Sequence, residues 1–223
     1  MKKALIAAGF GLAFALPTQA ALANVIVNGS FESPGGGAIR SWVDDTPPSS
    51  WAAGGTIYTD IYESSGQDTI TAQNGNYYVS WGHNGNIGGT LSQSFASTPG
   101  ATYTVDYFVT QQQGFDAAQQ VTVEALDGID ILGAVSMNMT MADGNWVSGT
   151  RLTFVAGPSG TTTLTFIDST PVGAGAGPNW ALDNVTVNSV PEPSTAILIG
   201  LGGLCVALRN RRFRVAPDRY AQR

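Results

Sequence analysis

Short segments in which apolar and polar residues alternate run through residues 24–190, separated by glycine, proline and asparagine. In the clearest segment, 102–110, one face is formed by Tyr103, Val105, Tyr107 and Val109. A period of two is typical of a β-strand with one buried face. The segments show no helical period, so we predict an all-β domain.

The same alternation predicts about ten strands, which is enough for two packed sheets in a jelly-roll β-sandwich. Two of the strands are expected to form a hairpin, because Asp127-Gly128 accepts the backbone angles of a two-residue turn. The predicted strands cover residues 24–28, 56–62, 77–81, 90–95, 102–110, 121–126, 129–135, 147–155, 161–167 and 180–187.

The first 23 residues have the pattern of a signal peptide. Lys2 and Lys3 precede an apolar run at 4–16, and Ala21-Leu22-Ala23 forms a small-residue cleavage site. An uncleaved membrane anchor is the alternative, but the run is shorter than the roughly 20 residues that a spanning helix needs. We therefore expect the mature chain to begin at Asn24 as a β-sandwich domain of residues 24–189.

A second uncharged run, at 196–208, is followed by the basic residues Arg209, Arg211, Arg212 and Arg214. Arginines that follow an apolar run keep that end in the cytoplasm, which places the preceding domain across the membrane. We therefore predict a short C-terminal transmembrane helix within a segment at 190–214. Residues 215–223 are expected to be a cytoplasmic tail.

The charge of the predicted domain limits its partners. Residues 24–190 contain two basic residues, Arg40 and Arg151, and fourteen acidic ones, a net charge of −12. Nucleic acid and anionic lipid are poor partners for such a surface, whereas divalent cations and neutral polymers are better ones.

Cysteine and histidine content excludes several kinds of site. The one cysteine, Cys205, lies in the C-terminal apolar run, so the exported domain has no disulfide and no thiolate metal site. The one histidine, His83, lies among glycines and asparagines, where we expect an exposed loop residue. No G-x-S-x-G motif and no marked carboxylate pair is present, so we expect a protein that is not an enzyme.

The segment Val190-Pro191-Glu192-Pro193-Ser194-Thr195, with the apolar run and the arginine cluster after it, resembles the PEP-CTERM sorting signal of Gram-negative bacteria. The resemblance implies export, transient anchoring in the inner membrane and processing by an exosortase-type enzyme. The destination it implies is the cell surface or an extracellular, exopolysaccharide-containing matrix. The tail after the arginines is longer than this signal usually has.

Residues 24–32, 91–103 and 180–187 resemble parts of galactose-binding-like jelly rolls, a group that includes many carbohydrate-binding modules. The resemblance implies that Glu32 and Asp183 coordinate a structural calcium ion, and hard oxygen ligands do suit calcium. The alternative is that both are exposed edge acids or hydrogen-bonded turn residues. A slip in the alternation between Leu182 and Val185 predicts a β-bulge beside Asp183.

Sugar recognition needs flat apolar rings with polar groups nearby. The candidates near predicted loops and strand ends are Trp42, Trp51, Trp81, Trp146, Tyr78 and His83. Tryptophans of small β-sandwiches are more often core or lid residues, which is the alternative for each. We predict a non-catalytic surface or matrix protein that associates with extracellular polysaccharide. The alternatives are a purely structural matrix or coat protein and a secreted glycan-active enzyme.

Overall fold

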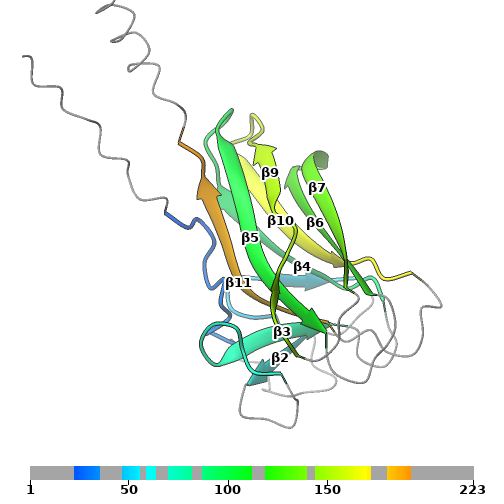
Figure 1. The fold of residues 1–223 in the computed structure, drawn as a ribbon. Helices are drawn as coiled ribbons and strands as arrows, with labels where there is room; N and C mark the ends of the chain where they lie inside the picture. Colours follow the sequence, from blue (N-terminus) through cyan, green and yellow to red (C-terminus); the bar gives the residue numbers. More distant parts are fainter. Residues whose placement is uncertain are drawn as a thin grey trace, which may run out of the picture.

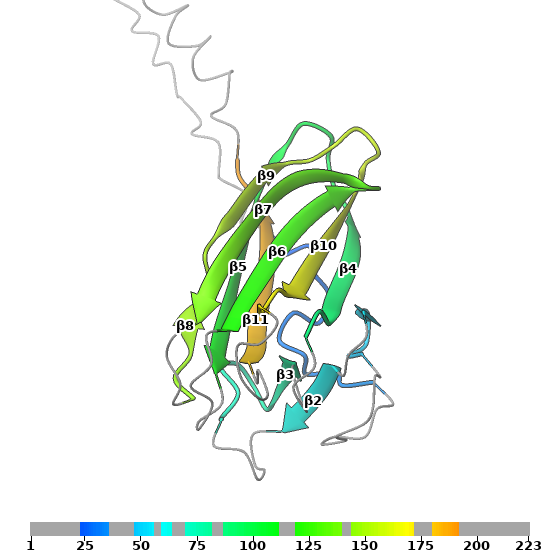
Figure 2. The same cartoon turned by 90° about the vertical axis from the view of Figure 1, so that its right-hand side faces the viewer.

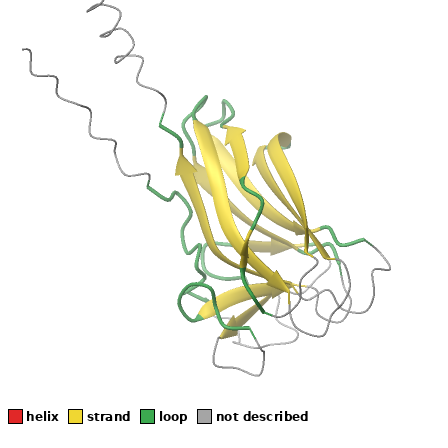
Figure 3. Cartoon of the chain, viewed as in Figure 1, coloured by secondary structure: helices red, strands yellow, loops and turns green. Residues whose placement is uncertain are grey.

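The fold is seen in a computed structural model that describes residues 23–35, 47–55, 59–63, 70–81, 87–111, 119–139, 144–171 and 180–191, with only the backbone at 59–63 and 81. These residues form two antiparallel sheets packed face to face (Figure 1). Figure 3 shows strands and loops and no helix among them, which confirms the predicted all-β class.

The first sheet has five strands, and its order brings together segments far apart in the sequence. Across the sheet the strands are β1 (Ala52–Gly54), β4 (Thr90–Ala96), β10 (Thr161–Asp168), β6 (Gln119–Asp127) and β7 (Asp130–Met139).

The second sheet has β11 and β5 at its centre, paired along most of their length. Across the sheet the strands are β2 (Thr59–Glu63), β3 (Tyr77–Trp81), β11 (Trp180–Ser189), β5 (Thr102–Gln111) and β8 (Val147–Ser148), while β9 (Leu152–Val155) also pairs with β5.

The core lies between the two sheets and is made by the inward positions that the alternation predicts. On β5 the side chains of Tyr103, Val105, Tyr107 and Val109 are buried, as expected from their common face. The T-shaped contact between Tyr107 and Phe166 of β10, with ring centroids 5.2 Å apart, joins the two sheets.

The predicted strand at 24–28 is not a strand, although the chain there lies beside β11. The backbone N–H of Val25 donates to Val187 O at 2.9 Å, but Asn24 Oδ1 accepts the N–H of Val187 at 2.8 Å. At Val27, the N–H donates to Gln93 Oε1 and the carbonyl accepts from Gln93 Nε2, both at 2.8 Å. Side chains therefore replace the backbone ladder that a strand would form.

The predicted strand at 147–155 is divided into β8 and β9, which both pair with β5. Between them the chain passes so close to the ring of Tyr107 that a Cβ at Gly149 would overlap it.

The turn of the β6–β7 hairpin lies one residue later than predicted. It is Gly128-Ile129 instead of Asp127-Gly128, with φ of 62° at Gly128. The short strand β1 was not expected from the alternation.

The sandwich has two ends with different roles. At the terminal end lie Asn24 and the last residues of β11, since Val25 pairs with Val187 (Figure 1). At the distal end β3, β5, β7 and β10 finish and β4, β6, β8 and β11 begin, as Figure 2 shows from the side. The described residues include no helix able to cross a bilayer, and the predicted C-terminal span lies outside them.

Replacing Gln93 by alanine is expected to lower the free energy of unfolding by about 2 kcal/mol, because two hydrogen bonds of a buried amide are lost. For a chain of this size this corresponds to a fall of roughly 5 °C in the melting temperature. The matched control is Gln120→Ala, whose amide bonds the side chain of Asn138 on an outer face. Equal losses of stability in the two variants would contradict the conclusion that the Gln93 amide holds the segment at Val27 in place.

Candidate binding site

Glu32 and Asp183 come from opposite ends of the chain and hold the same loop. Glu32 Oε1 accepts the backbone N–H groups of Asn76 at 2.8 Å and Tyr77 at 2.9 Å. Asp183 Oδ2 accepts the N–H of Asn74 at 2.9 Å. We call this arrangement of Glu32, Asp183 and residues 73–77 the carboxylate clasp.

The two carboxylates of the clasp have different surroundings. Asp183 is fully buried, whereas Glu32 is exposed. Burial, with a smaller contribution from the nearby charge of Glu32, raises the pKa of Asp183 to about 7, although N–H donors from the loop and from Asn184 lower it. The negative charge of Asp183 is thus only partly compensated by its hydrogen bonds.

The backbone around the clasp is irregular. Asn28, Phe31 and Asn184 have positive φ values of 54°, 57° and 51°. Such angles are unfavourable for a bulky residue such as Phe31, whose side chain is completely buried in the core. The register of β11 against β5 shifts between Asp183 and Thr186, which confirms the predicted bulge. The bulge and the strained residues together turn the two carboxylates toward one loop.

The clasp has part of what a calcium site needs. Two carboxylates face one loop, and the incompletely compensated charge of Asp183 would be stabilised by a cation. Calcium takes six to eight oxygen ligands, and among the described residues no third acidic, histidine or cysteine side chain joins the pair. Glu32 and Asp183 are therefore the side chains that would hold the ion, with the remaining ligands supplied by carbonyl groups and water.

Two of the aromatic candidates for sugar contact are packing residues. Trp51 is buried, donates its indole N–H to Asn28 O at 3.0 Å and packs against Phe31 with ring centroids 5.5 Å apart. Tyr78 is buried on the outer face of the second sheet, under the chain at 70–72. Neither ring has a face open to a ligand, so the structure corrects their expected role.

Trp146 covers part of the second sheet as a lid residue, which was the alternative to a role in sugar contact. Its indole N–H donates to Thr71 O at 2.6 Å, and its ring meets that of Tyr78 edge-on at 6.0 Å. Together with Ile70 and Ala72 it covers the outer face of β3 and β11 near the distal end. The ring is partly exposed, so it remains available at the surface.

The other aromatic candidates are placed only partly. The backbone of Trp81 ends β3 and pairs with Trp180 and Thr59, which puts it at the distal end. Trp42 and His83 lie outside the described residues. Of the predicted sorting residues, Pro191 is described and exposed, while Glu192, Pro193, Arg209, Arg211 and Arg212 lie outside as well.

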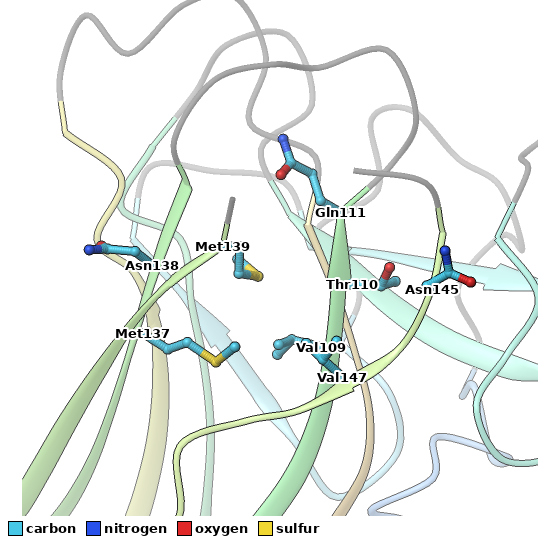
Figure 4. Close-up of a pocket in the computed structure, with 8 residues that line it drawn as sticks. All are labelled: Val109, Thr110, Gln111, Met137, Asn138, Met139, Asn145 and Val147. Carbon is cyan, nitrogen blue, oxygen red and sulfur yellow. The ribbon is translucent and has the colours of Figure 1, made fainter. Parts of the chain in front are cut away.

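A hollow of about 200 Å³ lies between the sheets at the distal end, and sequence analysis missed it. We call it the seam hollow; Figure 4 shows Met137 and Met139 on one side and Val109 on the other. Its remaining lining is Val147, Thr110, Gln111, Asn138 and Asn145. The available signal was the alternation Val135, Met137, Met139, which continues beyond the predicted end of the strand at residue 135.

Residues 189–212 match the PEP-CTERM protein-sorting motif, which confirms the resemblance seen in the sequence. The motif marks an exported protein that is held in the membrane before processing. The match begins at Ser189, the last residue of β11. No curated protein sequence matches the chain.

Several solved structures share the fold. A cyclase from Fischerella sp. TAU superposes with a TM-score of 0.58 at 18% identity, covering 78% of this chain and 100% of that chain. TmCBM61, solved in complex with beta-1,4-galactotriose, gives 0.55 at 16%, covering 75% and 99%. The CBM22-1-CBM22-2 tandem domain from Paenibacillus barcinonensis Xyn10C gives 0.52 at 17%, covering 77% and 47%.

These likenesses show the fold alone, because the identities are low. They confirm a jelly-roll-like β-sandwich of the architecture found in carbohydrate-binding modules, and the same architecture carries the cyclases. Fold similarity does not transfer a function, so the activity has to be argued from this chain's own surfaces.

In a chelating buffer, stability is expected to fall as pH rises from about 4 to about 7, since the folded state keeps a proton on Asp183 that the unfolded state releases. Asp183→Asn removes the titrating group, so this part of the pH dependence should disappear. In the parent, excess calcium should weaken or reverse this fall in stability with rising pH if the clasp binds the ion.

The measurement is the melting temperature at several pH values, with EDTA and with calcium. Asp130→Asn, which alters an exposed acid at the β6–β7 hairpin, is the matched control, and its melting temperature should change with pH as that of the parent does. Identical pH profiles for Asp183→Asn and the parent would show that Asp183 titrates normally.

Proposed function

We propose that the chain is an exported protein of a Gram-negative bacterium, processed by an exosortase-type enzyme and kept at the cell surface or in the extracellular matrix. There its β-sandwich associates with polysaccharide without catalysing a reaction. The observation that carries the proposal is the junction at Ser189, where a carbohydrate-binding-module-like fold continues directly into a sorting motif.

The sorting part of the proposal is supported by how the chain leaves the sandwich. The N–H of Val190 still donates to Thr102 O at 2.8 Å, and Pro191 is exposed. The two prolines of the motif cannot continue a strand ladder or enter a helix interior, so they keep the peptide extended for a processing enzyme.

Replacing both Pro191 and Pro193 by alanine is expected to leave the protein uncleaved and in the membrane fraction, because alanine would let the helix predicted at 196–208 extend through the recognition peptide. Intact mass and cell fractionation measure this outcome. The control is Pro158→Ala in the exposed turn between β9 and β10. Normal cleavage of the double variant would contradict recognition of an extended motif.

The polysaccharide part is supported by charge and by the position of the aromatic candidates. The acidic domain disfavours anionic polymers but not neutral ones. Trp81 and Trp146 belong to the distal end, opposite the sorting motif, and His83 follows β3 in the sequence. We assign the glycan contacts to these residues and to Trp42, with weak single contacts strengthened by the repetition of sites along a polymer.

Calcium is part of the same proposal as a structural ion. It would be held by Glu32 and Asp183 and would neutralise the clasp, while leaving the distal end free for a ligand. Its support is the incompletely compensated charge of Asp183.

The mature protein recovered from producing cells is expected to be retained on polysaccharide extracted from the same cells. Trp81→Ala should reduce retention at least tenfold, because a ring contact with sugar contributes on the order of 1 kcal/mol or more at each of several sites. Val155→Ala, an exposed change near the terminal end, is the control and should bind as the parent does.

Two other outcomes would identify a different function. If the parent protein shows no saturable binding to polysaccharide but is located normally in the matrix, it is a purely structural matrix protein. Release of sugar products that stops on changing a single Asp or Glu would indicate a glycan-active enzyme.

A further inference from the structure

The seam hollow exists because the two sheets separate along one edge. At Gly133 of β7 the sheets are in contact, since a Cβ there would lie 3.2 Å from Leu152 Cδ1 and 3.3 Å from Phe154 Cβ. Toward the distal end β9 has no counterpart of equal length, because β8 has only two residues. The edge therefore opens between Met137 and Met139 on β7 and Val109 on β5 (Figure 4).

The wall of the seam hollow is apolar on the inside and polar at its margin. Val109, Val147, Met137 and Met139 supply the apolar surface. Asn138 and Asn145 are exposed at the margin, and none of the described lining residues carries a charge. Such a wall favours a neutral ligand, because an ion would lose its hydration without gaining a partner.

One buried polar side chain beside the seam hollow has no partner among the residues that the structure describes. Gln119 is fully buried opposite Met139 in the β6–β7 ladder, and both atoms of its amide are unpaired. Buried polar groups are nearly always hydrogen-bonded, so these atoms indicate a missing partner.

Water alone satisfies this environment poorly. An ordered buried water needs two to four polar partners, and four apolar side chains occupy the wall. A molecule with an apolar body and one or two hydrogen-bonding groups matches both features. The volume of about 200 Å³ fits a single ring with small substituents, since an apolar protein cavity of roughly 150 Å³ binds benzene.

We propose that the seam hollow is a binding site for a small uncharged ligand that combines an apolar ring with a hydroxyl or amide group. The ring packs against Met137, Met139 and Val109, and the polar group bonds the amide group of Gln119, which lies opposite Met139. The site is separate from the glycan contacts assigned to Trp81 and Trp146, and it does not depend on them.

The test uses the mature protein with ¹³C-labelled methionine methyl groups and three probes of similar size. Met137 and Met139 are two of the four methionines in the chain, so their signals report directly on the seam hollow. Benzyl alcohol is expected to shift both signals in a saturable way. Toluene should bind several-fold more weakly, and benzoate at least tenfold more weakly.

Two variants locate the site. Val147→Phe fills the mouth of the seam hollow and should abolish the shifts, while Val155→Phe, a matched change on the exposed side of β9, should leave them unchanged. Gln119→Leu should weaken the binding of benzyl alcohol at least threefold and leave the binding of toluene unchanged, because it removes the unpaired amide and keeps the size of the side chain. The spectrum of each variant without probe shows whether it is folded.

The proposal is overturned if no probe shifts the methionine signals of the parent, or if the shifts persist in Val147→Phe. It is also overturned if benzoate binds as well as benzyl alcohol, because the site would then not select neutral ligands.

Discussion

Hydrogen bonds from amide and carboxylate side chains to backbone groups join the N-terminal segment to β4 and β11 and join both chain ends to the loop before β3, and the rest of the structure depends on these contacts. Gln93 of β4 bonds Val27, and Asn24 accepts the N–H of Val187 in β11. Asp183 and Glu32 accept backbone N–H groups of the loop before β3 and of its first residue. Because β11 lies between β3 and β5, fixing the N-terminal segment to it also fixes the centre of the second sheet.

This arrangement separates the molecule into two working regions. The terminal end contains the paired chain ends and the start of the sorting motif. The distal end contains Trp146, the end of β3 and the seam hollow. The long central strands connect the regions rigidly, so a ligand at one end does not have to compete with processing at the other.

The sequence was sufficient for features that depend on local periodicity. The inner face of β5 and the bulge after Asp183 follow from alternation alone, because each inward residue packs against the opposite sheet. Features that depend on partners far away in the chain could not be predicted from the sequence. The amide of Gln93 replaces a ladder for Val27, the ring of Tyr107 divides 147–155, and the burial of Trp51 depends on Phe31 and Phe166. The seam hollow depends on how far two sheets diverge, which no single segment encodes.

The absence of a spacer between β11 and the sorting motif has a mechanical consequence. The motif match begins at Ser189, where an interior strand of the second sheet ends. Tension applied to the C-terminal segment therefore acts along the axis of β11, and it loads many ladder hydrogen bonds in shear at once rather than peeling them singly. Resistance to forced unfolding depends on the height of the unfolding barrier. A sandwich attached in this way is suited to bear tension between the cell envelope and whatever it holds at its other end.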